Sequence, residues 1–249
     1  ALSEEAVRVG AGGAIAAEIS SYQLEATGDF RPKVAAVLNL TPDHVVRHGS
    51  LDVYRQMKEK IFAWQTPEDF VVLNYDDPVT RGMAERAPST VCFFSRKARL
   101  SSGAFLVNGE IVLRWQGEIH RILPVEALRV RGTHNVENVL AACAMAFLGG
   151  VEPSKMAAVL RDFSGIEHRI EPVAEIGGVR YYNDSKATNI DSAVKVLESF
   201  PGESVILIAG GEDKMTDLKD FMRTVKAHCR GLILLGDAAA RFQAAALSA

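Results

Sequence analysis

Seven residues, Asn183 to Asn189, read NDSKATN and combine an acid, a lysine, two hydroxyls and two amides. They follow the apolar run GVRYY and precede IDSAVKVLESF, whose apolar residues recur at helical spacing. The order strand, loop, helix places these polar groups outside the carboxyl end of a strand, where open α/β sheets bind ligands. An Asx turn followed by a helix N-cap would explain Asn183 or Asn189 but gives Lys186 no role. We therefore interpret this loop as functional.

Other polar residues also follow predicted strands. Glu18 ends a short apolar segment, Asp43 and His44 come just after VAAVLNL, Lys58 lies on the next helix, and Lys214 follows VILIAGG. Taken singly, each has a plain structural explanation as an exposed side chain or a helix cap. Their convergence at one edge of a predicted sheet instead favours a functional site that they form together. A glutamate and a histidine placed there suit a hard divalent cation.

The elements that must position these residues alternate between short apolar runs and segments of helical spacing, which predicts an α/β architecture. Between about Cys92 and Arg131 the pattern changes to the short strands VCFFS, AFLVNGEIVLRW and EIHRILPV, and Asn108-Gly109 favours a hairpin. An antiparallel patch is therefore expected beside the parallel sheet. The rhythm of strand and helix restarts near Gly165, which predicts two domains, residues 1–165 and 166–249.

Composition narrows the class of partner. The chain has 249 residues, 48% hydrophobic and 24% charged, with a net charge of −3. A nucleic-acid or anionic-membrane binder usually carries a basic excess, so small molecules are the expected partners. Cys92, Cys143 and Cys229 form no C-x-x-C pair and fit a reducing compartment. No basic leader or long apolar span is evident, so we expect a cytoplasmic location.

Seven motifs together carry a resemblance to a known family. They are AEISSYQLE, NLTPDHVVRHGSLDVYRQMKEKIF, VLNYDDP, GTHNVENVLAA, GIEHRIE, YNDSKATN and LIAGGEDK. Their order and approximate spacing, from about Glu18 to Lys214, are similar to those of the Mur ligases. SSYQLE and NDSKATN point to the members that add D-glutamate, because sibling ligases carry different residues there. The resemblance implies a central ATP-binding domain with a parallel sheet at 1–165, followed by an incomplete Rossmann-like domain at 166–249.

The same resemblance implies an activity. Mur ligases form an amide by moving the γ-phosphoryl of ATP onto a substrate carboxylate, and the amine of an amino acid then attacks the acyl phosphate. Here the implied substrates are UDP-N-acetylmuramoyl-L-alanine and D-glutamate, with ATP and Mg²⁺, in peptidoglycan synthesis. We expect a monomer without nucleic-acid or membrane partners. A sibling Mur ligase, a folylpoly-γ-glutamate ligase and a non-catalytic ligand-binding remnant remain open alternatives.

Residue roles follow by position in the matching motifs. As magnesium ligands the resemblance implies Glu18, His44 and a carbamylated Lys58. As nucleotide and phosphate contacts it implies Asn138, Arg169, Asp184 and Lys186, with Asn135 as a weaker candidate that could instead cap a helix. As substrate contacts it implies Thr188 and Lys214 for D-glutamate and, less strongly, Ser20 and Gln23 for the muramoyl group. Lys58, His44 and Lys186 would be catalytic, and His168 is expected to be a structural neighbour.

Two departures from the family pattern bear on these expectations. No Gly-Lys-Thr/Ser phosphate loop precedes Glu18, since VGAGGA has neither the lysine nor the position. The family usually has an acid two residues after the histidine, where this chain has Val46, so the contacts that would orient His44 differ. ATP binding depends on the phosphate loop. We therefore expect this chain by itself to be inactive or nearly so.

Overall fold

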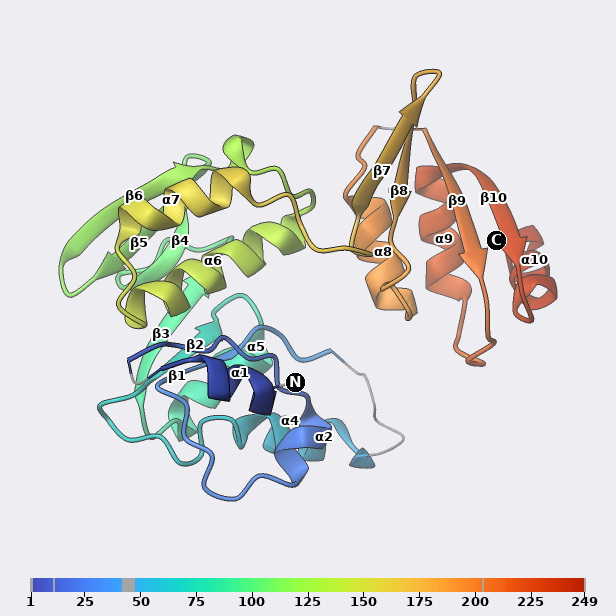
Figure 1. The fold of residues 1–249 in the computed structure, drawn as a ribbon. Coiled ribbons are helices and arrows are strands. Elements are labelled where there is room, and N and C mark those ends of the chain that lie inside the picture. Colours follow the sequence, from blue (N-terminus) through green and yellow to red (C-terminus); the bar gives the residue numbers. More distant parts are fainter. Residues whose placement is uncertain (1, 11, 42–47, 203, 249) are drawn as a thin grey trace. The chain divides into compact units, whose positions relative to one another are not determined.

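The structure is a computed structural model that describes residues 2–10, 12–41, 48–202 and 204–248 (Figure 1). The chain divides into two compact units. Unit 1 comprises residues 1–107, 112–120 and 140–152, and unit 2 comprises residues 108–111, 121–139 and 153–249. The domain boundary near Gly165, which the alternation of strands and helices in the sequence indicates, stays a prediction. No helix among the described residues is long and apolar enough to cross a membrane.

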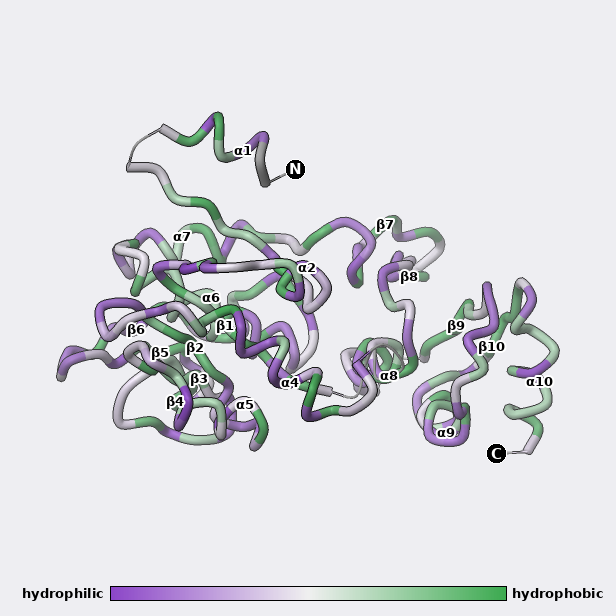
Figure 2. Tube along the Cα trace, turned by 90° about the horizontal axis from the view of Figure 1, so that it is seen from below, coloured by the Kyte–Doolittle hydropathy of each residue, from purple (hydrophilic) through white to green (hydrophobic). Residues whose placement is uncertain are grey.

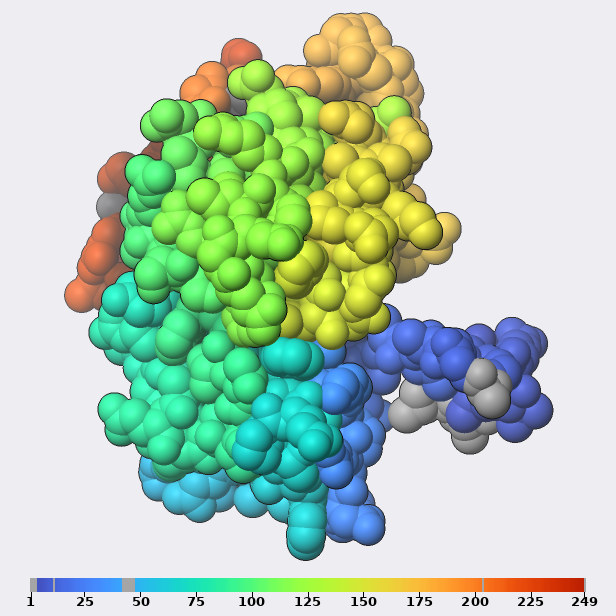
Figure 3. Space-filling view, turned by 90° about the vertical axis from the view of Figure 1, so that its left-hand side faces the viewer, coloured from blue at the N-terminus to red at the C-terminus, as the bar shows by residue number. Residues whose placement is uncertain are grey.

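The first half of the chain alternates strands and helices, as its pattern predicts. In order, the elements are α1 (Leu2–Arg8), α2 (Ser21–Glu25), β1 (Val34–Val37), α4 (Leu51–Glu59), β2 (Phe70–Asn74), α5 (Pro78–Gly82), the 3₁₀ helix η1 (Met83–Arg86), β3 (Thr90–Ser95) and β4 (Gly103–Val107). The residues described in α1 from Glu4 onward are exposed, and Figure 3 shows this segment standing out from the rest of unit 1.

A six-stranded sheet in the order β1-β2-β3-β4-β5-β6 forms the framework, with β5 at Glu110–Trp115 and β6 at Glu118–Pro124. The pairs β1-β2, β2-β3 and β3-β4 are parallel. Val71 and Leu73 of β2 are fully buried and pack with Phe62 and Tyr54 in one apolar cluster. Burial on both faces explains why β2 reads as a continuous apolar run rather than an alternating one.

The antiparallel patch is present but smaller than expected. Asn108 (φ 51°) and Gly109 (φ 77°) form a two-residue connection between the neighbouring strands β4 and β5, which is the predicted hairpin. The run VCFFS, expected in this patch, instead forms β3 and lies parallel to β2, with Val72 opposite Cys92. Its β-branched and aromatic residues specify a strand but not the direction of its partner.

The rest of the chain begins with the 3₁₀ helix η2 (Val125–Ala127), α6 (Thr133–Leu148) and α7 (Pro153–Asp162). Then come β7 (Glu171–Ile176), β8 (Val179–Asn183), α8 (Ile190–Glu198), β9 (Val205–Gly210), α9 (Lys219–His228), β10 (Cys229–Leu235) and α10 (Ala239–Leu247). Strands β9 and β10 pair in parallel, and one side of them packs with α8 and α9 around Leu197, Phe221 and Met222. Figure 2 shows β9, whose sequence is VILIAG, as a largely hydrophobic strand.

Strand β7 was not expected from the sequence. It pairs antiparallel with β8, and Gly177 (φ 58°) and Gly178 (φ 77°) connect them. A Gly-Gly pair with positive φ at both residues is a preferred hairpin turn, so the signal was available in IGGV. The hairpin matters for the site because β8 ends at Asn183, the first residue of NDSKATN.

Gly210 fixes the path of the chain from β9 toward Lys214. Its φ is +141°, and a Cβ at this position would lie 1.8 Å from the carbonyl oxygen of Leu235. The next residue, Gly211, donates its backbone N–H to the same oxygen at 2.9 Å. The close approach of the two strand ends therefore requires glycine at 210.

We expect Gly210→Ala to lower the free energy of unfolding by about 3 kcal/mol or more, because backbone strain and overlap with Leu235 both oppose the methyl group. Urea unfolding followed by circular dichroism measures it. Gly231→Ala in β10 is the matched control, since its Cβ would meet the Ile206 side chain at an ordinary 3.8 Å. The control should change stability by at most about 1 kcal/mol. Equal effects at both positions would show that the close approach is not what requires glycine.

Candidate active site

The NDSKATN loop contains both structural features considered from its sequence. Asn183 Oδ1 accepts a hydrogen bond from the backbone N–H of Ser185 at 3.1 Å, which is an Asx turn. Asn189 is the N-cap of α8 and accepts from the N–H of Ser192 at 2.8 Å. These contacts account for the two asparagines. The side chains of Lys186 and Thr188 are exposed and serve neither feature.

Residues 168–171 lie against this loop. The Lys186 N–H donates to the carbonyl oxygen of His168 at 3.1 Å, and the Ile170 N–H donates to Asp184 Oδ1 at 2.9 Å. Asn183 Nδ2 lies 2.8 Å from His168 Nδ1 and 3.1 Å from Glu171 Oε2. His168 is thus a structural partner of the loop, as expected, and the contacts hold the intervening Arg169 beside it.

The backbone on both sides of Arg169 is strained. His168 has φ 67° and Ile170 has φ 46°, in the left-handed region. This conformation is unusual for any residue except glycine and is an outlier for a β-branched one. Such strain tends to persist at functional positions. Arg169 itself is exposed, so its guanidinium is available to an anion.

Lys214 joins the same cluster from the loop after β9. Its Nζ donates to the carbonyl oxygen of Thr188 at 2.8 Å. Arg241 of α10 holds the preceding residue, with Nε and NH2 at 2.7 and 2.6 Å from the two oxygens of Asp213. The hydrogen bonds that Asp213 accepts from Arg241 and from the Met215 N–H lower the pKa of its carboxyl group, and the charge of Arg241 adds to this. The sequence did not reveal this support, because 28 residues separate the partners.

The start of α6 corrects one expectation. Gly132, with φ +90°, supplies the carbonyl oxygen that accepts from the N–H groups of Asn135 and Val136 at 3.1 and 3.3 Å. Asn135 lies inside the first turn and its Nδ2 donates to the carbonyl oxygen of Arg131 at 2.6 Å, so it is not an N-cap. Asn138 is exposed and donates to Asn135 Oδ1 at 3.3 Å. Helix α6 begins at Thr133, before Asn135, and Asn138 lies one turn beyond Asn135 along the helix.

His134 and Asp184 interact electrostatically within unit 2. Burial lowers the pKa of His134, the charges of Lys195 and Arg169 lower it further, and Glu137 and Asp184 oppose them. Burial raises the pKa of Asp184, while the Ile170 N–H, His134 and Arg169 act in the opposite direction. His134 lies within the GTHNVENVLAA motif, but its residue type and position did not predict a role for it. A histidine beside two asparagines at a helix start was the only signal for it.

We expect Asp184→Asn to raise stability at pH 7. A carboxyl group with a raised folded pKa binds its proton more tightly when folded, so its ionisation destabilises the fold as pH rises above about 4. Asparagine removes that charge and keeps an oxygen for the Ile170 N–H. Urea unfolding at pH 7 and pH 4 measures the difference, which should shrink at the lower pH. A loss of stability at pH 7 would contradict the expectation.

Ser20 and Gln23, in unit 1, form a capping box at the start of α2. Gln23 Oε1 accepts from the Ser20 backbone N–H at 2.8 Å and from Ser20 Oγ at 3.0 Å, and Ser20 Oγ accepts from the Gln23 N–H at 3.3 Å. Glu18 is exposed two residues earlier, in a segment without regular structure rather than at the end of a strand.

Lys58 lies in the last turn of α4 and is half-buried. Its Nζ stands over the ring of Tyr54, 5.2 Å from the ring centroid. His44 lies outside the described residues, as does Val46. Among the residues that the structure describes, no group of three or more His, Cys, Asp or Glu side chains could hold a metal ion. The expected metal ligands are thus not tested by the described geometry.

Comparisons with known proteins match this arrangement to one family. Residues 6–146 match the family model for the Mur ligase middle domain, and residues 168–249 match that for the Mur ligase, glutamate ligase domain. The UDP-N-acetylmuramoylalanine--D-glutamate ligase of Pelotomaculum thermopropionicum is 46% identical over 238 residues, which are 96% of this chain and 52% of that protein. The ligase of the same name from Caldanaerobacter subterraneus is 44% identical over 242 residues, 97% of this chain and 53% of that protein.

Solved structures show the same fold at low identity. MurF from Acinetobacter baumannii superposes with a TM-score of 0.67 at 20% identity, over 87% of this chain and 49% of that one. The UDP-N-acetylmuramate-alanine ligase MurC from Thermotoga maritima gives a TM-score of 0.65 at 20% identity, over 92% of this chain and 51% of that one. The chain spans about half the length of the relatives it matches. Because its two family matches together cover nearly the whole sequence, in the order in which the motifs occur, the chain belongs to the Mur ligase family.

Proposed function

We propose that this protein, at the full length of its relatives, is an ATP-dependent ligase that joins D-glutamate to UDP-N-acetylmuramoyl-L-alanine. The names of relatives at 44 and 46% identity support this substrate pair. The observation that carries the proposal is the cluster in unit 2, where one loop brings together Arg169, Lys186 and Lys214. Three exposed cations around one loop suit a reaction in which phosphates and carboxylates must be held.

Within this cluster, we assign the D-glutamate contacts to Thr188 and Lys214. Lys214 already donates to the backbone of Thr188, so the ammonium and the hydroxyl lie on neighbouring groups. An ammonium can donate three hydrogen bonds, which leaves donors for a carboxylate of the amino acid. The hydroxyl of Thr188 would donate to a second oxygen of that substrate.

The nucleotide contacts are assigned to Asn138, Arg169, Asp184 and Lys186. The residue types fit ATP, because the cations Arg169 and Lys186 can hold phosphates, and the polar side chains of Asn138 and Asp184 can bond a ribose or an adenine. When bound, ATP supplies the phosphoryl group that activates the substrate carboxylate. Arg169 would hold a phosphate by its planar fork of N–H groups, and Lys186 would neutralise charge at the transferred group.

Magnesium is assigned to Glu18, His44 and a carbamylated Lys58. The donor types fit, since carboxylate and carbamate oxygens are the ligands that Mg²⁺ prefers. Carbamylation needs the amine in its neutral form, which then adds to carbon dioxide. In the same unit, Ser20 and Gln23 would bind the muramoyl substrate from the start of α2.

A phosphate-release assay on the full-length protein tests the proposal. We expect release from ATP only when UDP-N-acetylmuramoyl-L-alanine, D-glutamate and Mg²⁺ are all present. A preference for L-alanine, a diamino acid or L-glutamate would identify a sibling Mur ligase or a folylpoly-γ-glutamate ligase instead. No turnover with any amino acid, from folded protein that still binds nucleotide, would support the non-catalytic remnant.

A further inference from the structure

His48 is a buried histidine that none of the assigned roles uses. It is 9% exposed and lies two residues before Ser50, the N-cap of α4. Its Nε2 is 3.1 Å from Ser21 Oγ, and its Nδ1 is 3.7 Å from Glu25 Oε1. Its ring stacks on Tyr54 with centroids 5.2 Å apart and planes at 20°. A buried imidazole with partners on α2 and α4 therefore links these two helices.

His48 lies between Ser21 and Glu25, as the histidine of a hydrolytic triad lies between its serine and its acid. The geometry argues against such a triad here. Ser21 is only 4% exposed, so its hydroxyl cannot reach a substrate carbonyl. The 3.7 Å between His48 and Glu25 exceeds a hydrogen bond. A triad needs an accessible nucleophile and a close bond between base and acid. The contacts instead fix the position of α2.

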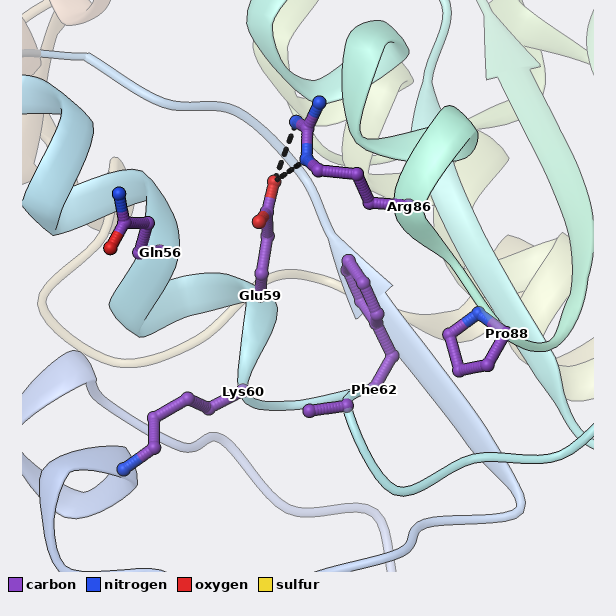
Figure 4. Close-up of a pocket in the computed structure, with 7 residues that line it drawn as sticks. Gln56, Glu59, Lys60, Phe62, Arg86 and Pro88 are labelled. Atoms are coloured by element: carbon purple, nitrogen blue, oxygen red, sulfur yellow. Dashed lines mark hydrogen bonds and ion pairs between the residues drawn. The ribbon is translucent and has the colours of Figure 1, made fainter.

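A second contact fixes the other end of α2. Lys60 follows α4, and its Nζ donates to the carbonyl oxygens of Leu24 and Glu25 at 2.9 and 3.2 Å. These are terminal carbonyls of α2, which a cation satisfies well. Figure 4 shows the Lys60 side chain leading away from the neighbouring ion pair, in which Arg86 binds Glu59. Helix α2 is therefore held against α4 near both of its ends.

The two helices carry different parts of the proposed site. Ser20 and Gln23 lie at the start of α2, next to Ser21. Lys58 lies on α4, and its Nζ stands over the ring of Tyr54, the same ring on which His48 stacks. A contact chain thus runs from Ser21 through His48 and Tyr54 to Lys58. A helix of five residues is not stable by itself, so α2 depends on such contacts for its place.

We propose that His48 is a positioning residue that sets Ser20 and Gln23 at the correct distance from Lys58 for binding the muramoyl substrate. This inference rests on the proposed function. Holding the start of α2 matters because a shift of about 1 Å in a binding group can change a rate by about 100-fold. D-glutamate contacts lie in unit 2 and do not depend on α2. The role of His48 is therefore specific to one substrate.

The test is steady-state kinetics of His48→Phe in the full-length enzyme. Phenylalanine keeps a ring on Tyr54 and removes both nitrogen contacts. We expect the KM for UDP-N-acetylmuramoyl-L-alanine to rise about tenfold, and the KM for D-glutamate to stay within about twofold. His48→Gln should recover part of the loss, because its amide can bond Ser21. A purely structural role would lower the apparent kcat with all substrates alike and leave both KM values unchanged, which would overturn the inference.

Two further variants separate the explanations. Ser21→Ala removes the hydroxyl that contacts His48 Nε2 and should give the same selective rise in the KM for UDP-N-acetylmuramoyl-L-alanine. This variant tests the inference even if His48→Phe fails to fold. His120→Phe is the matched control, because His120 also contacts an aromatic ring, that of Phe147 at 5.4 Å, but lies on β6. It should leave both KM values unchanged, and a selective rise there would overturn the inference. A folded but inactive wild type would overturn the proposed function, and this inference with it.

Discussion

Lys58→Ala in the full-length protein is expected to lower kcat for ligation by about 10²- to 10³-fold. The lysine would act as a carbamate, and alanine removes the anionic oxygens that approach the metal. Phosphate release at saturating substrates measures the loss. Added bicarbonate or a small carboxylate should restore part of the activity by supplying an anion in the space left by the side chain.

Lys58→Arg separates carbamylation from simple positive charge. Arginine keeps the cation over Tyr54 but stays protonated and cannot form a carbamate. Lys58→Arg should therefore lose as much ligation activity as Lys58→Ala does. Lys155→Ala, which removes an exposed lysine from helix α7, is the control and should retain full turnover. Near-normal turnover of Lys58→Arg would show that the carbamylation assignment is wrong.

Lys214→Ala should raise the KM for D-glutamate by about 10- to 100-fold, the cost of losing one hydrogen bond to a charged group. The KM for UDP-N-acetylmuramoyl-L-alanine should change little, because its assigned contacts lie in unit 1. Initial rates at varied concentrations of each substrate measure both values. Such an effect would identify Lys214 as the counter-charge of the amino acid.

Because Lys214 also bonds the backbone of Thr188, alanine could act by loosening the loop. Lys214→Gln distinguishes the two causes, since its amide can donate to that carbonyl but carries no charge. It should keep the raised KM for D-glutamate. Lys219→Ala, at the start of α9, removes a nearby exposed lysine and should have no effect. A normal KM in Lys214→Gln would assign the lysine to the loop rather than to the substrate.

Local signals in the sequence predicted the local structure well. Asn108-Gly109 gave the expected hairpin, and Asn183 and Asn189 make the Asx turn and the N-cap that their types favour. These features depend on neighbours within about four residues, so the chain itself carries the information. The Gly-Gly hairpin at Gly177 and Gly178 follows the same rule. The α/β class and its alternating elements were predicted for the same reason.

Contacts between distant residues could not be predicted in this way. His48 and Ser21 are 27 residues apart, and Arg241 and Asp213 are 28 apart. Nothing in the pattern around either residue identifies its partner, because pairing depends on how helices pack. The helix start at Thr133, which moved Asn135 off the cap position, likewise depends on the backbone of Gly132. The roles of Glu18, His44 and Lys58 rest on the family resemblance.

A competition assay tests the proposed choice of D-glutamate most directly. The full-length protein is given ATP, Mg²⁺, UDP-N-acetylmuramoyl-L-alanine, and equal amounts of D-glutamate and isotopically heavy L-glutamate, and the mass of the product is determined. We expect a ligated product that carries only the light D-amino acid. A product that carries heavy L-glutamate, or no ligated product from a folded protein, would contradict it.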